Sequence, residues 1–270
     1  MWINYIEVNY LFWYIESVLI LNMYGINKKL VIVVTSFFFC IRYNECMDEV
    51  RIIEVKQSVF AANDNKANEL RSELKRKGIF LLNVMSSPGS GKTTTLTKLI
   101  NELKDEFKIG VMEADIDSDV DARTISKMTG VEAIQLHTGG MCHLDAGMTS
   151  QGIENLNSDD YDLIILENVG NLVCPAEFDT GAVKNMCILS VPEGDDKPLK
   201  YPLMFEVSNF VLINKIDVLP YFDFNVDKCK ENIKYRNKYA DIFEICAKDG
   251  SGIKEVAEYL RKEIKNWKEK

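Results

Sequence analysis

Short apolar runs recur along this chain after residue 78, and amphipathic or polar stretches separate them. Runs of five to nine mostly apolar residues are typical of strands that are buried on both faces, and such strands occur mainly in parallel sheets covered by helices. The pattern therefore predicts an α/β fold with a mainly parallel sheet flanked by helices, and a binding crevice at the carboxyl ends of its strands. The predicted strands cover residues 79–85, 108–114, 131–136, 161–167, 183–191, 209–215 and 241–247.

Two stretches precede this pattern. From Ser58 to Lys77, Val59, Leu70 and Leu74 recur at helical spacing and Gly78 follows, which predicts a surface helix leading into the fold. Residues 1–46 differ from the rest because they are dense in aromatic and β-branched residues and carry few charges. We expect them to form an extension that is spurious or dispensable, with residues 47–270 making up one domain.

Composition narrows the class of protein. The 270 residues are 47% hydrophobic and carry a formal charge of -9, so the overall field repels nucleic acid and anionic lipid. The apolar runs before Met47 fall short of the roughly 20 residues that a membrane span needs, and no cleavable signal peptide is evident. Seven scattered cysteines without a C-x-x-C pair indicate reduced thiols in a cytoplasmic protein.

The stretch "NVMSSPGSGKTTTLTKLI" (83–100) predicts a phosphate-binding loop between a strand and a helix. In the pattern G-x-x-x-x-G-K-[ST], backbone N–H groups surround the phosphates, the lysine reaches the terminal phosphates and the hydroxyl holds Mg²⁺. Ser86 replaces the first glycine, but the turn that follows is still rich in glycine. The expected nucleotide contacts are Gly89, Ser90, Gly91, Lys92, Thr93 and Thr94.

The later stretch "INKID" selects the base. A carboxylate such as Asp217 can accept hydrogen bonds from the N1–H and the 2-amino group of guanine, and adenine offers no such pair of donors. We expect Asn214 at the other edge of the ring and the stem of Lys215 along its face. Ala247, in "CAKDGSG", either places its N–H near the guanine oxygen or belongs to a plain strand-to-helix turn.

Hydrolysis requires acidic groups beside the phosphates. Asp115 and Glu167 each end a predicted strand, so we expect both to join Thr93 around Mg²⁺ and to act with Lys92 in catalysis. The acidic residues between Asp117 and Asp121 are better explained as helix caps. No arginine or glutamine is obviously placed for the transition state, which predicts slow intrinsic GTP hydrolysis.

Both histidines of the chain lie in "QLHTGGMCHLD", and Cys142 adjoins His143 there. Cys174 follows Glu167 in the next such loop. Thiolate and imidazole are ligands of nickel and zinc, so these three residues form a candidate metal site if the fold brings the loops together. A buried cysteine and a capping histidine are the alternative.

With these motifs the chain resembles the HypB family of hydrogenase nickel-incorporation GTPases. The resemblance runs from about Asp48 to the C-terminus. It implies a P-loop GTPase of the SIMIBI class that forms a homodimer and delivers nickel to [NiFe] hydrogenase large-subunit precursors with a partner metallochaperone. It also implies that Cys142, His143 and Cys174 bind the metal. The segments that carry it are "MSSPGSGKTT", "HTGGMCHLDA", "LENVGNLVCPAEFD", "EGDDKPLKYP" and "NKIDVLPYFDFNVDKC".

Some features depart from the resemblance and leave alternatives open. The chain has neither the N-terminal cysteine motif nor the histidine-rich stretch that many members carry, so nickel storage is in doubt. One alternative is a nickel or zinc carrier with a vestigial nucleotide pocket. Another is a urease-accessory GTPase, although the Cys-Pro-His motif of those proteins is missing. A small-molecule kinase is disfavoured by the stretch from Asn214 to Asp217.

We predict that a chain beginning at Met47 keeps the stability and the GTPase rate of the full chain, because residues 1–46 lie outside the expected domain. Thermal unfolding and phosphate release, measured on both chains, check this. A large loss of either property on truncation would show that the extension belongs to the fold.

Overall fold

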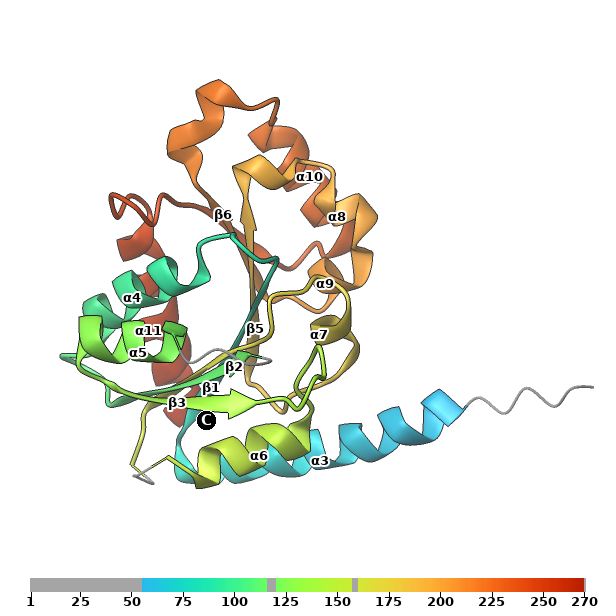
Figure 1. Cartoon of the computed structure of the whole chain (residues 1–270), viewed down its shortest axis with the longest axis vertical. Coiled ribbons are helices and arrows are strands. Elements are labelled where there is room, and N and C mark those ends of the chain that lie inside the picture. Colours follow the sequence, from blue (N-terminus) through green and yellow to red (C-terminus); the bar gives the residue numbers. More distant parts are fainter. Residues whose placement is uncertain (1–54, 116–119, 157–159, 270) are drawn as a thin grey trace, which may run out of the picture. The chain divides into compact units, whose positions relative to one another are not determined.

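The computed structural model describes residues 55–115, 120–156 and 160–269, so the expectation for residues 1–46 lies outside the described part. The described residues form one seven-stranded sheet in the order β3-β2-β4-β1-β5-β6-β7, and every strand pair is parallel. The predicted α/β fold and all seven predicted strands are confirmed (Figure 1). The strands are β1 (Phe80–Ser86), β2 (Ile109–Asp115), β3 (Glu132–His137), β4 (Leu163–Glu167), β5 (Lys184–Ser190), β6 (Phe210–Asn214) and β7 (Asp241–Glu244).

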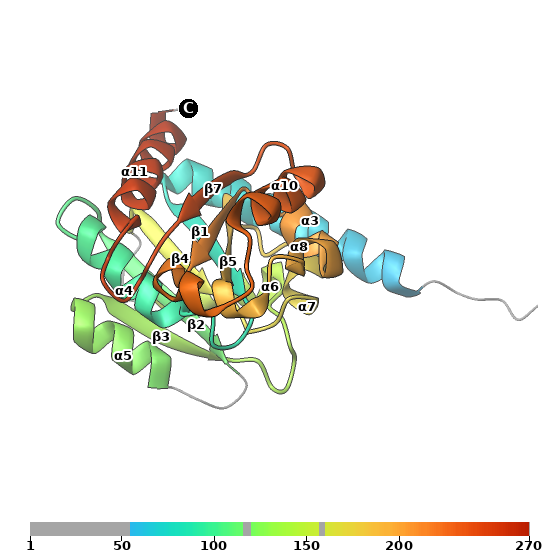
Figure 2. The same ribbon diagram turned by 90° about the horizontal axis from the view of Figure 1, so that it is seen from above.

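Helices cover both faces of the sheet (Figure 2). Helices α4, α5 and α11 pack on one face around Leu96, Ile125 and Leu260. On the other face, α3 and α6 cover one half of the sheet, and α7, α9 and α10 cover the other half. The helices are α3 (Val55–Lys77), α4 (Lys92–Leu103), α5 (Val120–Thr129), α6 (Ala146–Glu154), α7 (Cys174–Glu177), α8 (Lys197–Lys200), α9 (Pro202–Glu206), α10 (Val226–Arg236) and α11 (Ile253–Glu269), with 3₁₀ turns η1 (Val191–Glu193) and η2 (Ile216–Tyr221).

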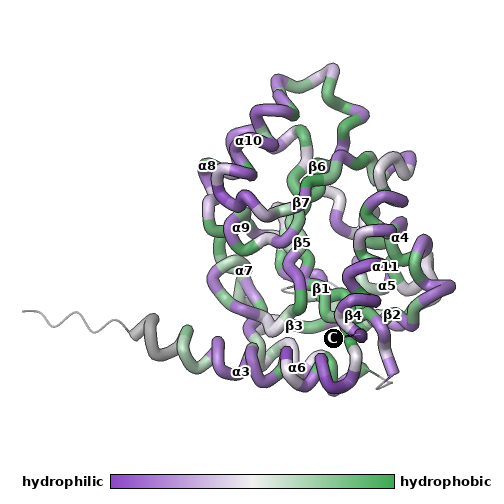
Figure 3. Tube along the Cα trace, turned by 180° about the vertical axis from the view of Figure 1, so that it is seen from behind, coloured by the Kyte–Doolittle hydropathy of each residue, from purple (hydrophilic) through white to green (hydrophobic). Residues whose placement is uncertain are grey.

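The lead-in helix α3 begins three residues before its predicted start and ends before Gly78, as predicted. Its apolar side chains Leu70 and Leu74 are buried against the sheet, while most of its other residues from Asn63 onward are hydrophilic (Figure 3). No helix in the described ranges is both long enough and apolar enough to cross a bilayer. The burial of Leu70 and Leu74 stabilises α3 in its position on the sheet.

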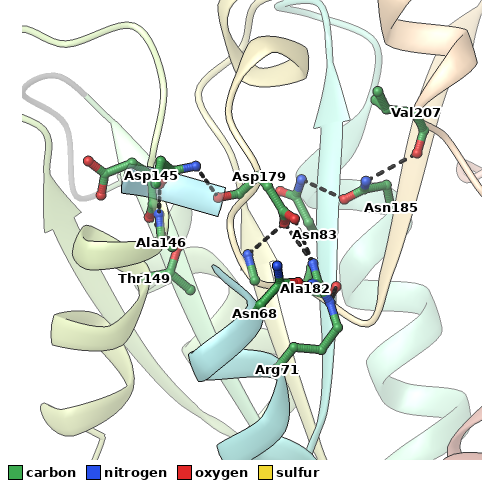
Figure 4. Close-up of polar contacts among 12 residues, drawn as sticks. Asn68, Arg71, Asn83, Asp145, Ala146, Thr149, Asp179, Ala182, Asn185 and Val207 are labelled. Carbon is green, nitrogen blue, oxygen red and sulfur yellow. Dashed lines mark hydrogen bonds and ion pairs between the residues drawn. The ribbon is translucent and has the colours of Figure 1, made fainter. Parts of the chain in front are cut away.

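A row of asparagine side chains crosses three neighbouring strands near the middle of the sheet. Asn83 on β1 donates to Asn185 Oδ1 on β5 at 3.0 Å and accepts from Asn168 Nδ2 at 3.2 Å. Asn185 Nδ2 in turn donates to the carbonyl of Val207 at 3.1 Å (Figure 4). Because Asn168 directly follows β4, this row fixes the start of the loop that leads to Cys174.

Replacing Asn83 with alanine is expected to lower the free energy of unfolding by about 2 to 3 kcal/mol, because a buried donor on Asn168 and an acceptor on Asn185 each lose their partner. Denaturant unfolding measures the change. Lys98→Ala, on the exposed side of α4, is the matched control and should change stability by less than about 0.5 kcal/mol. Equal effects of the two substitutions would contradict a structural role for the row.

Candidate functional site

The predicted phosphate loop lies between β1 and α4, where Gly91 has the left-handed angles φ 96° and ψ 29°. A Cβ atom at Gly91 would lie 2.6 Å from Asn214 Nδ2, so both the backbone and the space require glycine here. Gly91 caps α4 without a side-chain hydrogen bond, which leaves the first N–H groups of the helix directed at the loop. This arrangement suits an anionic group such as a phosphate.

The loop is braced by contacts that the sequence did not reveal. Ser90 Oγ donates to Ser86 Oγ at 2.8 Å, so the serine at the position of the missing glycine has a structural role. The hydroxyl of Ser87 contacts the carboxylate of Glu193. Glu193 also accepts hydrogen bonds from the N–H and the hydroxyl of Ser190, both at 2.8 Å. The end of β5 thereby supports the phosphate loop.

Asn214 was expected to face the edge of a guanine ring. In the structure it is buried and joins three segments of the protein. Its Nδ2 donates to the carbonyl of Ser90 at 2.9 Å. Its Oδ1 accepts from the N–H of Lys215 at 2.8 Å and from the N–H of Ala247 at 3.1 Å. The Ala247 N–H, for which either a guanine oxygen or a plain strand-to-helix turn was expected, is thus engaged with Asn214 within the protein. The reason is burial, since an amide as deeply enclosed as Asn214 must find its partners inside the fold.

Lys215 reaches across the phosphate loop. Its backbone is left-handed with φ 65°, and its Nζ donates to the carbonyl of Gly89 at 2.6 Å. Asp217, two residues further along in η2, has an exposed side chain. A carboxylate at this edge of the phosphate loop remains accessible to a ligand.

A second group of acidic side chains lies beside the loop. Carboxylate oxygens of Glu113, Asp121 and Glu167 lie within 4.8 Å of one another, and Glu113 and Glu167 are direct neighbours on β2 and β4. Oxygen ligands of this kind suit Mg²⁺. Glu167 was expected here and Glu113 was not. Asp121, which was expected to be a helix cap, lies in the first turn of α5 and joins the two glutamates. Asp115 ends β2, but its side chain lies outside the described part of the structure.

Sequence periodicity could have indicated Glu113. Residues two apart on a strand point to the same face, and Glu113 lies two positions before Asp115. Asp121 was missed because it lies in the first turn of α5, where an acidic side chain normally needs no further explanation. Only the packing of α5 against β2 shows that it belongs to the cluster.

The segment after β4 packs directly on the phosphate loop. A Cβ atom at Gly170 would lie 3.3 Å from Lys92 Nζ and 3.4 Å from the backbone nitrogen of Pro88. A side chain at Gly170 would require Lys92 or Pro88 to move by a few tenths of an ångström. The residues that follow Gly170 therefore begin directly beside Lys92.

The structure brings together two of the three predicted metal ligands. The thiol of Cys174 lies beside Cys142 and, together with burial, raises the pKa of the Cys142 thiol. The imidazole of His143 instead stacks on Phe178, with 3.9 Å between ring centroids and 11° between planes. Burial lowers the pKa of His143. Within the described residues, the three do not form a converging ligand group.

Comparison with known proteins identifies the family. Residues 80–244 match the family described as "CobW/HypB/UreG, nucleotide-binding domain". The chain is 43% identical over 214 residues to the hydrogenase maturation factor HypB of Rhizobium leguminosarum bv. viciae, covering 79% of this chain and 71% of the relative. The chain belongs to the CobW/HypB/UreG family. The resemblance to HypB found in the sequence is confirmed.

Other HypB proteins agree with this result. The hydrogenase/urease maturation factor HypB of Helicobacter pylori (strain J99) is 41% identical over 212 residues, which cover 77% of this chain and 86% of the relative. The crystal structure of HypB from Helicobacter pylori in complex with nickel has a TM-score of 0.71 and 41% identity, covering 76% of this chain and 96% of that one. The crystal structure of HypB from Archaeoglobus fulgidus has a TM-score of 0.70 and 36% sequence identity, and the match covers 76% of this chain and 99% of that one.

We predict that Cys174→Ala accelerates alkylation of Cys142 at neutral pH. The neighbouring Cys174 raises the pKa of Cys142, so its removal lowers that pKa and increases the thiolate fraction. The rate of iodoacetamide labelling against pH, read on the Cys142 peptide by mass spectrometry, measures the shift. Cys187→Ala is the control, because Cys187 is buried in a different cluster. An unchanged pH profile in Cys174→Ala would contradict the contact between the thiols.

Proposed function

We propose that this protein is a GTP-hydrolysing metallochaperone that assists nickel insertion into [NiFe] hydrogenase precursors, with nucleotide state coupled to metal binding and dimerisation. One observation carries the proposal: two segments contact the same phosphate loop from different sides. Asn214 and Lys215 bond to Ser90 and Gly89, and Gly170 lies against Lys92. The first segment leads to Asp217 and the second leads to Cys174. The proposed base-recognition residue and the proposed metal ligand are therefore both connected to the loop that would bind the phosphates.

GTP is the proposed substrate. The N–H groups from Gly89 to Thr94 would surround its phosphates, and Lys92 would stabilise charge on the transferring phosphoryl group. Asp217 would accept from the N1–H and the 2-amino group of guanine. Asn214 and Ala247 would act by holding the base-binding turn against the phosphate loop.

Mg²⁺ fits the donor set on this edge of the sheet. Thr93, in the first turn of α4, and the carboxylates of Glu113, Asp121 and Glu167 are the residues that would hold it, together with Asp115 as first expected. Mg²⁺ supplies charge neutralisation at the phosphates when bound. We propose that intrinsic hydrolysis is slow.

Nickel is the proposed cargo, with zinc as the alternative ion. The neighbouring thiols of Cys142 and Cys174 supply soft ligands, and the relative from Helicobacter pylori has been crystallised in complex with nickel. Two thiolates fill half of a four-ligand set. His143, after leaving Phe178, or a second copy of this chain in a homodimer would supply the remainder.

The proposed partners are a nickel metallochaperone and a hydrogenase large-subunit precursor in the cytoplasm. A urease precursor is a second candidate, because the Helicobacter relatives are named hydrogenase/urease maturation factors. A metal carrier with a vestigial nucleotide pocket is less well supported, since the chain keeps Lys92 at the start of α4 and an acidic residue, Asp217, in η2.

Asp217→Asn is expected to weaken GTP binding by about 3 kcal/mol, roughly a hundredfold, and to favour xanthine nucleotides, because the new amide donates where the carboxylate accepted. Fluorescence titration with GTP, XTP and ATP measures the change. Asp223→Asn, an exposed acidic residue beyond η2, is the matched control and should bind as the parent does. Equal affinity of the parent for GTP and ATP would overturn the assignment of Asp217.

We further predict that GDP and a non-hydrolysable GTP analogue give different nickel or zinc affinities in the parent, because Gly170 connects the terminal phosphate position to Cys174. The expected coupling is about 1 to 3 kcal/mol, and by reciprocity the metal changes GTP affinity equally. Isothermal titration with each metal and nucleotide, in the parent and in Cys174→Ala, measures it. Identical metal affinities in both nucleotide states of the parent would exclude the coupling.

A further inference from the structure

The lead-in helix α3 contacts the second loop that carries a proposed metal ligand, and it contacts the start of α6 directly after the first such loop. We define the first cysteine loop as residues 138–145, which contain Cys142 and His143, and the second cysteine loop as residues 168–183, which contain Cys174. Helix α3 runs beside α6 and below the second cysteine loop (Figures 1 and 4). Helix α3 makes these contacts although it belongs to neither the phosphate loop nor the base-binding turn.

The two cysteine loops have few direct connections. They follow different strands, and within these two fully described ranges no backbone–backbone hydrogen bond joins one loop to the other. Side chains connect them: the Cys174 thiol lies beside Cys142, and His143 stacks on Phe178. Their relative position therefore depends on side chains.

Asn63 of α3 bridges the two loops through one amide group. Its Oδ1 accepts from the N–H of Ala146, the first residue of α6 and the residue directly after the first cysteine loop, at 3.0 Å. Its Nδ2 donates to the carbonyl of Asp179 in the second cysteine loop at 2.8 Å. Asn63 is buried, and the Ala146 N–H lies in the first turn of α6, where the helix offers no acceptor. The bridge thus satisfies groups that otherwise lose their partners.

One turn earlier on α3, Phe60 extends the same arrangement. Its ring centroid lies 4.9 Å from that of Phe178, which stacks on His143. His143 Nδ1 is buried and has no hydrogen-bond partner. Aromatic contact with Phe178 rather than a hydrogen bond at Nδ1 holds this imidazole, so its place depends on the position of the second cysteine loop.

A separate anchor keeps α3 in place without Asn63. Arg71, two turns further along, donates to both carboxylate oxygens of Asp179 at 2.8 Å and to the carbonyl of Ala182 at 3.0 Å (Figure 4). Leu70 and Leu74 are buried on the same side. Loss of the Asn63 amide should therefore leave the helix docked and change the relation between the loops.

We propose that Asn63 is a positioning residue of the metal site, which holds the two cysteine loops so that their ligands face one ion. This inference rests on the proposed metal binding by Cys142 and Cys174. It makes the lead-in helix part of the cargo site and assigns it no role in GTP hydrolysis.

The test measures nickel affinity of the reduced full chain for the parent, Asn63→Ala, Asn63→Asp and the control Asn65→Ala. Asn65 also lies on α3 and is exposed. We expect Asn63→Ala to weaken nickel binding by 10- to 100-fold, as is usual when a residue supporting metal ligands is removed, and Asn65→Ala to bind as the parent does. The metal-free GTPase rate should stay within twofold throughout.

The Asn63→Asp variant tests whether Asn63 connects the two cysteine loops or only caps the start of α6. Aspartate can still accept from the Ala146 N–H but cannot donate to the Asp179 carbonyl, so a bridging role predicts a loss similar to that of Asn63→Ala. Affinity equal to that of the parent in Asn63→Asp overturns the proposal. So does loss of metal-free GTPase activity in both variants, because Asn63 would then serve the fold as a whole.

A metal-free readout distinguishes this proposal from the proposed function. Dibromobimane, a short reagent that bridges two thiols, should link Cys142 to Cys174 in the parent and at least fivefold more slowly in both Asn63 variants. If Cys174→Ala binds nickel as the parent does, the metal site is wrong, and the linking rate still tests the bridge. Unchanged linking in both Asn63 variants overturns the positioning role.

Discussion

In a parallel sheet, the loops that follow the strands lie together at one edge, but the backbone hydrogen bonds of the sheet do not join these loops to one another. Each polar group buried at that edge must find a partner in a different loop, and in this protein asparagine side chains supply many of them. Asn83, Asn214 and Asn63 each join segments far apart in the sequence. One amide offers both donors and an acceptor, so a single side chain can satisfy two or three backbone groups at once.

This constraint links the fold to the site. Asn83 fixes the start of the second cysteine loop, and Asn214 holds the base-binding turn against the phosphate loop. Glu193, in the turn η1 directly after β5, braces the phosphate loop as well. The phosphate loop is therefore contacted by segments at the ends of three other strands, β4, β5 and β6.

The sequence predicted what depends on local pattern. Continuous apolar runs indicated all seven strands, and the glycine-rich turn indicated the phosphate loop and its helix. The contacts of Asn63, Glu193 and Asp121 were not predictable, because their partners lie far along the chain and only packing brings them close. The stacking of His143 on Phe178 was missed for the same reason, since the residue type suggested a ligand and gave no sign of its ring neighbour.

Lys215 illustrates a trade-off between stability and activity. In the described part of the chain it is the only residue other than glycine with a positive φ, a conformation that costs an ordinary side chain about 1 kcal/mol. Glycine would adopt it without that strain but would lose the contact of Nζ with the carbonyl of Gly89. Selection for folding alone would favour glycine at this turn. The lysine at this turn indicates that the side-chain contact with the phosphate loop outweighs the strain in the backbone.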